Sequence, residues 1–191
     1  RMLAHYLARY DGGRYAKLLL EDDIHQINAD KIGISRRQVK TVTYAFLYGA
    51  GDEKIGHSYD QQLSTTAAKK KGKEIRAAYV DAVDGLDDLL NAIKKAAERG
   101  FIKSIDGRKI NVDSPHKALN YCLQSGAGVI AKRWMVINQE TMREAQICAS
   151  QLGFIHDELQ FECAPEHVGD LSTSLVYSAT AAGEYYNMRI R

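Results

Sequence analysis

The sequence predicts an α+β protein that is mainly helical and carries a small antiparallel β-sheet. Apolar residues recur at helical spacing over most of the chain, and two stretches in its second half contain short β-rich runs around a polar turn. The 191 residues are 45% hydrophobic and 26% charged, which is close to globular averages. One domain, or two small ones, can therefore bury a core.

Three short helices are predicted in the N-terminal part of the chain. The first ends at the glycine-rich turn 11–13, and the second includes the leucines at 18–20. The third begins at the acidic pair 22–23, because acidic side chains are favoured at the positive end of a helix dipole.

The best-delimited helix follows Ser35. Serine is a good N-cap, so a helix is expected over 36–48, and the glycines within 49–51 supply a C-terminal stop. Between 65 and 98, apolar residues at helical spacing predict two further helices with a break near Gly85.

The remaining elements alternate between hairpins and helices. A β-hairpin is expected over 101–112, because an Asp-Gly pair separates two short β-rich runs. A long helix should follow over 115–145. Strands at 147–155 and 159–163 are then expected to flank His-Asp-Glu, and a last helix should run over 165–185.

Composition says little about partners. Lys and Arg number 26 against 24 Asp and Glu, so the overall charge neither requires nor excludes a nucleic acid. Cys122, Cys148 and Cys163 form no C-x-x-C pair, which predicts a reduced cytosolic protein without structural zinc. No apolar run approaches the roughly 20 residues that span a bilayer, so no membrane partner is expected.

Four side chains on the predicted helix 36–48 form one stripe. Arg36, Lys40, Tyr44 and Tyr48 are spaced by four, and each step returns the side chain to within roughly 40° of the previous one. Two cations followed by two aromatic rings suit phosphates and a flat base or sugar. The alternative is a solvated basic face with both tyrosines packed in the core.

The string from Arg36 to Gly49 resembles motif B of the family A DNA polymerases, the relatives of bacterial DNA polymerase I. The following residues, 49–56, look like the bacteriophage replicative branch of that family. The resemblance implies part of a right-hand polymerase fold, with mainly helical fingers and a palm that carries a small antiparallel sheet. It implies entry helices at 1–30, fingers at 31–100 and palm at 101–191.

The resemblance also implies roles for the stripe. Arg36 and Lys40 would hold the triphosphate of the incoming dNTP, and Lys40 would also neutralise or protonate the leaving pyrophosphate. His25 would contact the triphosphate from the preceding helix. Tyr44 would lie beside the 3′ carbon of the sugar, and Tyr48 would stack near the template base.

Two acids stand at the junction of the last two predicted strands. Asp157 and Glu158 could hold Mg²⁺, which prefers oxygen ligands, although an isolated His-Asp-Glu is more often an ordinary polar turn. Residues 156–158 resemble motif C of the same family. That resemblance makes Asp157 a metal ligand in a two-Mg²⁺ centre and Glu158 an auxiliary acid, and it places His156 at the primer terminus.

Four more residues are candidates for contacts with primer-template DNA. Asn120 and Gln124 lie one helical turn apart, and amides can both donate to and accept from minor-groove base edges. Either amide could instead cap a helix or lie on the surface. Arg108 and His116 are weaker candidates for the template side.

The resemblance does not include motif A, whose aspartate is the other metal ligand of the family. We expect this aspartate upstream of Arg1 in a longer protein, so the isolated chain should have little polymerase activity. The resemblance implies DNA and dNTPs as partners, with or without a processivity factor, and action in the cytoplasm of a phage's bacterial host.

Three other interpretations stay open. The chain could be a non-catalytic nucleic-acid-binding module derived from a polymerase. It could be a metal-dependent phosphohydrolase with His156 and Asp157 as an adjacent ligand pair, which would require further ligands on helices. An RNA polymerase of related architecture is the nearest functional neighbour.

Overall fold

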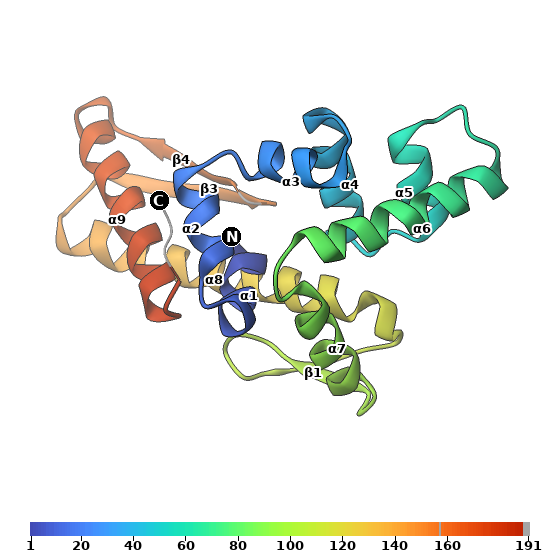
Figure 1. Cartoon of the computed structure of the whole chain (residues 1–191). Coiled ribbons are helices and arrows are strands. Elements are labelled where there is room, and N and C mark those ends of the chain that lie inside the picture. Colours follow the sequence, from blue (N-terminus) through green and yellow to red (C-terminus); the bar gives the residue numbers. More distant parts are fainter. Residues whose placement is uncertain (157, 189–191) are drawn as a thin grey trace. The chain divides into compact units, whose positions relative to one another are not determined.

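The computed structural model describes residues 1–156 and 158–188 (Figure 1). The predicted α+β class is confirmed, since helices dominate and two antiparallel hairpins accompany them. The chain divides into two compact units, Arg1–Gln124 and Ser125–Arg191. Each unit has its own candidate residues and is described by itself.

Unit 1 contains seven helices and one hairpin among its described elements, followed by a short 3₁₀ turn at Pro115–Lys117 and the start of α8. Their bounds are α1 (Met2–Asp11), α2 (Arg14–Glu21), α3 (Ile24–Ile32), α4 (Arg36–Leu47), α5 (Asp52–Tyr59), α6 (Thr65–Ala82), α7 (Leu86–Ala97), β1 (Phe101–Lys103), β2 (Lys109–Asn111) and α8 (Ala118–Glu144).

Most helix boundaries agree with the sequence prediction. Ser35 caps α4 through a capping box, in which its side chain accepts from Gln38 N–H and the Gln38 side chain accepts from Ser35 N–H. Gly85 separates α6 from α7 in a left-handed conformation, with φ 76°. Helix α5 was not predicted, because its eight mostly polar residues give a weak apolar pattern.

The main core of unit 1 lies where helices from distant parts of the sequence meet. Its fully buried residues include Leu7, Tyr79 and Leu86, from α1, α6 and α7. Phe46 of α4 joins the same cluster, and its ring lies 5.1 Å from that of Tyr79. This core fixes the side of α4 that faces inward.

Helices α5 and α6 cross at two glycines. A Cβ on Gly72 would lie 1.7 Å from the carbonyl oxygen of Asp52, and a Cβ on Gly56 would lie 2.0 Å from that of Ala68. The two backbones can approach this closely because neither glycine carries a side chain. The crossing makes this helix pair one packed body.

Unit 2 combines the remainder of α8 with a hairpin and a last helix. Strands β3 (Ala149–Ile155) and β4 (Glu158–Cys163) pair antiparallel, and a 3₁₀ turn at Pro165–His167 precedes α9 (Val168–Tyr185). Strand β3 begins two residues later than predicted, and Glu158 belongs to β4 rather than to the turn. Both proline-initiated helices begin with a 3₁₀ turn, which places the α-helical starts three residues later than expected.

A buried amide joins α8 to α9 in unit 2. Asn138 is 1% exposed, and its Oδ1 accepts hydrogen bonds from Ser174 Oγ at 2.8 Å and Ser178 Oγ at 3.3 Å. The indole of Trp134 donates to the Leu175 carbonyl at 2.9 Å. These bonds satisfy polar groups that burial would otherwise leave unpaired.

Candidate functional site

The predicted stripe on α4 faces solvent. Arg36 and Lys40 are exposed, and Tyr44 and Tyr48 are 49% and 66% exposed. The opposite face of the helix supplies the buried residues, which are Val39, Val42, Thr43 and Phe46. The alternative in which both tyrosines pack in the core is therefore wrong. Tyr48 is the C-cap of α4 and not a residue within it.

Helix α3 brings His25 to this stripe. The His25 ring lies 6.4 Å from the ring of Tyr44, and Arg36 Nε lies 2.7 Å from Asp23 Oδ2. Burial lowers the pKa of His25; the charge of Asp23 opposes this shift, and the cations Arg36 and Lys40 add to it. The fold thus groups His25, Arg36, Lys40 and Tyr44 on one surface.

This surface suits an anion with a flat group attached. Arg36 and Lys40 supply positive donors, and the lowered pKa of His25 favours the neutral imidazole, which can still donate one hydrogen bond. Tyr44 adds an aromatic ring beside these donors. Phosphates and a nucleoside would find complementary groups here.

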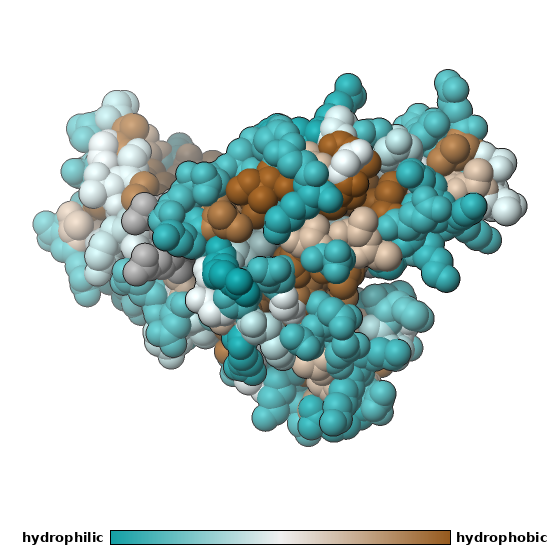
Figure 2. All heavy atoms as spheres, viewed as in Figure 1, coloured by the Kyte–Doolittle hydropathy of each residue, from teal (hydrophilic) through white to brown (hydrophobic). Residues whose placement is uncertain are grey.

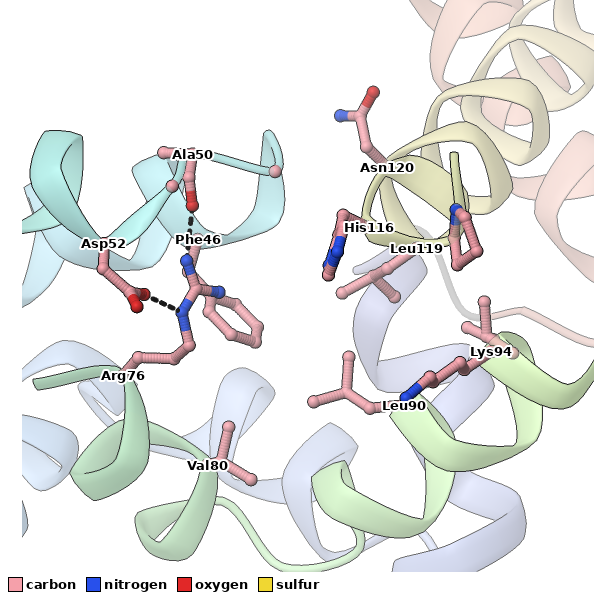
Figure 3. A pocket seen from close by; sticks show the side chains of 14 residues that line it. Phe46, Ala50, Asp52, Arg76, Val80, Leu90, Lys94, His116, Leu119 and Asn120 are labelled. Atoms are coloured by element: carbon pink, nitrogen blue, oxygen red, sulfur yellow. Dashed lines mark hydrogen bonds and ion pairs between the residues drawn. The ribbon is translucent and has the colours of Figure 1, made fainter. Parts of the chain in front are cut away.

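A second feature of unit 1 is a pocket of about 550 Å³ beyond the C-terminal end of α4 (Figure 3). Figure 2 shows apolar residues at the surface in the middle of the view, with hydrophilic residues around them. The pocket is lined by Phe46, Gly49, Ala50, Gly51, Asp52, Arg76, Val80, Leu90, Ile93, Lys94, Pro115, His116, Leu119 and Asn120.

Arg76 organises one wall of this pocket. Its Nε lies 2.6 Å from Asp52 Oδ1, its Nη2 donates to the Ala50 carbonyl, and its guanidinium lies over the Phe46 ring (Figure 3). His116 and Asn120 project from the other side. The sequence alone did not indicate Arg76, because its partners lie more than 20 positions away in the chain.

Asn120 has a structural partner in the described chain. Its Nδ2 donates to the Leu47 carbonyl at 3.2 Å, so the amide caps the last turn of α4. This is one of the alternatives that the sequence left open. The contact of Asn120 with DNA stays a prediction.

We expect Asn120→Ala to lower the free energy of unfolding of unit 1 by about 1 kcal/mol, because the Leu47 carbonyl loses its amide donor. Hydrogen exchange of the α4 amides in the 191-residue chain measures this loss. Gln124→Ala is the matched control, since Gln124 is exposed. An equal effect of the two substitutions would contradict the capping role.

The other three DNA candidates of unit 1 lie on the surface, and one of them is His116, which is exposed beside the pocket. Gln124 is exposed on α8, one turn after Asn120. Arg108 is exposed in the β1–β2 hairpin, where its Nε lies 2.6 Å from Asp106 Oδ2. Their contacts with DNA stay predictions.

The predicted carboxylate turn lies in unit 2. Ile155 pairs with Glu158, and His156 between them is exposed and has a positive φ of 57°, which is uncommon outside glycine. Glu158 is exposed, and its Oε1 accepts a hydrogen bond from Gln160 Nε2 at 2.9 Å. Asp157, the predicted metal ligand, lies outside the described residues.

Within the described ranges, no group of three or more His, Cys, Asp or Glu side chains could hold a metal ion. The phosphohydrolase interpretation relies on Asp157, which lies outside these ranges, so it stays an open alternative. None of the described helices is both long and apolar enough to cross a membrane.

Comparisons of this chain with a family model and with the sequences of known proteins agree with one another. A family model described as DNA polymerase family A matches residues 14–188. The chain is 34% identical to the DNA-directed DNA polymerase of Enterobacteria phage T3 and 32% identical to that of Escherichia phage T7, in each case over 99% of this chain and 29% of the relative. It is 28% identical to DNA polymerase I of Mycobacterium bovis, over 86% of this chain and 20% of that protein.

A solved structure has a similar fold. The polymerase domain of Pol1 from M. smegmatis, in complex with DNA primer-template and dNTP, matches with a TM-score of 0.77 and 22% identity. The match covers 95% of this chain and 35% of that one. The chain thus spans about a third or less of the length of the proteins that it matches.

Proposed function

This chain belongs to DNA polymerase family A, and on that premise we propose that it supplies the fingers and most of the palm of an enzyme for template-directed DNA synthesis. In this proposal residues 1–30 enter the fingers, 31–100 form the fingers and 101–191 belong to the palm. The observation that carries the proposal is that Arg36 and Lys40 are exposed beside His25. Together these side chains offer the positive donors that binding of a triphosphate requires.

The proposed reaction joins a dNTP to a primer. The primer 3′-oxygen attacks the α-phosphorus, and the bond to the pyrophosphate oxygen breaks. Phosphoryl transfer of this kind depends on positioning and on neutralising charge. Arg36 and Lys40 would bind the triphosphate, and Lys40 would hold or supply a proton at the leaving oxygen. His25 would donate a hydrogen bond from α3.

We propose that divalent metal ions bind in unit 2. Carboxylates are the oxygen donors that Mg²⁺ prefers, and the exposed Glu158 carboxylate at the start of β4 fits such an ion. Asp157 and Glu158 would hold Mg²⁺, with two ions in the complete centre. When bound, the ions lower the pKa of the primer hydroxyl and neutralise triphosphate charge.

The DNA contacts complete the proposal. His156 would contact the primer terminus, Asn120 and Gln124 the minor groove, and Arg108 and His116 the template side. Tyr48, exposed at the end of α4, would stack near the template base. We place the enzyme in phage replication, in the cytoplasm of a bacterial host.

Primer extension by the full-length polymerase that contains this chain tests the proposal. With Mg²⁺ and all four dNTPs, the native enzyme should extend a primer according to the template, and Asp157→Asn should reduce extension by about a hundredfold or more. Glu162→Gln is the control, because it removes an exposed carboxylate from the same hairpin. Native protein that binds DNA without extending it would favour the non-catalytic binding module.

Tyr44 provides a separate prediction about sugar selection. Its hydroxyl is expected to fill the space of a missing 3′-OH, so the native polymerase should accept dideoxynucleotides readily. Tyr44→Phe should lower the relative rate of dideoxynucleotide incorporation by about tenfold or more, the effect of one lost hydrogen bond or close contact. Single-turnover incorporation of matched dideoxy- and deoxynucleotides measures the ratio, with Tyr48→Phe as control. A native enzyme that already rejects dideoxynucleotides would contradict the prediction.

A further inference from the structure

One carboxylate joins the two helices that carry the proposed triphosphate residues. Asp23 Oδ2 accepts a hydrogen bond from Arg36 Nε at 2.7 Å, at the start of α4. Its Oδ1 accepts from the backbone N–H groups of His25 at 3.1 Å and Gln26 at 3.2 Å, at the start of α3. Asp23 therefore caps one helix and holds the first side chain of the next.

The contact with Arg36 uses Nε and leaves the end of the side chain open. Within the described part of the chain, no hydrogen bond or ion pair engages Arg36 Nη1 or Nη2. The guanidinium is planar, so a bond at Nε restricts the plane in which both Nη groups lie. An oriented pair of donors is what bidentate phosphate recognition requires.

The ion pair is exposed to solvent. The Arg36 and Asp23 side chains are 52% and 47% exposed, and surface ion pairs of this kind contribute little to folding. The carboxylate also lies beside a surface where an anionic triphosphate is proposed to bind. An acid at this place repels the ligand, and holding a residue that binds the ligand would offset this repulsion.

We infer that Asp23 is a positioning residue for the incoming nucleotide, which orients the Arg36 guanidinium and ties it to the helix that presents His25. The inference rests on the proposed function of the stripe. It goes beyond that function because Asp23 itself would touch neither the triphosphate nor the DNA.

Two physical effects of Asp23→Asn change the affinity for dNTP in opposite directions. Removing a negative charge near the triphosphate would by itself tighten dNTP binding. Losing the charge-assisted bond to Arg36 would free the guanidinium and weaken binding. Asparagine is as good an N-cap as aspartate, so α3 should keep its start and the fold should be unaffected.

The experiment measures the dNTP dissociation constant and the maximal rate by single-turnover incorporation, in the full-length polymerase bound to primer-template. Asp23→Asn should raise the dissociation constant about tenfold, with a rate change of less than about threefold. Asp22→Asn is the matched control, because Asp22 is an exposed neighbour of Asp23 and the substitution removes the same charge. It should leave the dissociation constant unchanged within about twofold.

A double-mutant cycle separates positioning from general damage. In an Arg36→Ala background, Asp23→Asn should cause no further loss of dNTP affinity, because the side chain to be positioned is gone. An unchanged or tighter dissociation constant in Asp23→Asn, or an equal loss in both backgrounds, would overturn the inference while polymerase activity stands. A native enzyme that fails to extend primers would overturn both.

Discussion

Lys40→Ala is expected to lower kcat/KM for dNTP incorporation by about 100- to 1,000-fold in the polymerase that contains this chain. Lys40 is exposed on α4, and its charge acts on His25 of α3, so it lies in the group of residues proposed to hold the triphosphate. Charge grows on the leaving pyrophosphate as its bond breaks, so a positive donor there stabilises the transition state more than the bound substrate. The loss should therefore appear in kcat as well as in KM.

Arg37→Ala is the control for this loss. Arg37 is an exposed cation on the same helix, and its side chain points about 100° away from that of Arg36 and about 60° away from that of Lys40. Its removal should change kcat/KM by less than about threefold, the range of general electrostatic effects on a solvated surface. If both variants lost activity equally, overall charge and not the stripe would explain the result, and the assignment of Lys40 would fail.

The second large effect concerns the crossing of α5 and α6. Gly72→Ala should lower the stability of this helix pair by about 3 kcal/mol or more, because the new methyl group would overlap the carbonyl of Asp52, whose oxygen lies 1.7 Å from the ideal Cβ position. A backbone carbonyl cannot rotate aside as a side chain can, so the two helices must separate. Hydrogen exchange of the α5 and α6 amides should show the loss.

Gly128→Ala gives the contrasting control. Both glycines lie within helices, and helix propensity alone favours alanine by about 1 kcal/mol at either position. A Cβ on Gly128 meets nothing within 4 Å, so this variant should be neutral or stabilising. Stabilisation by Gly72→Ala would show that the helices do not cross as closely as described.

The stripe was predictable because spacing by four defines one face of any α-helix. Which way that face points depended on packing, since a tyrosine can be buried or exposed. Phe46 and Val42 on the opposite face fill two core clusters, which leaves Tyr44 and Tyr48 in solvent.

Other features had no local signal. Helix α5 is short and mostly polar, and it packs against α6 through the close approach at Gly56 and Gly72 and through Ile55, which shares a core cluster with Ile75. The bond from Asn120 to the Leu47 carbonyl joins residues 73 positions apart. No pattern within a helix identifies a partner at that distance.

The sequence by itself determined the α+β class, most helix limits and the family, because capping residues, periodicity and motif spacing act within a few turns of chain. Only the tertiary structure decided the exposure of the α4 stripe, the Asp23–Arg36 bond between α3 and α4, and the helix-capping partner of Asn120. These depend on which distant elements meet, and that is settled by the joint packing of side chains from several helices rather than by any one segment.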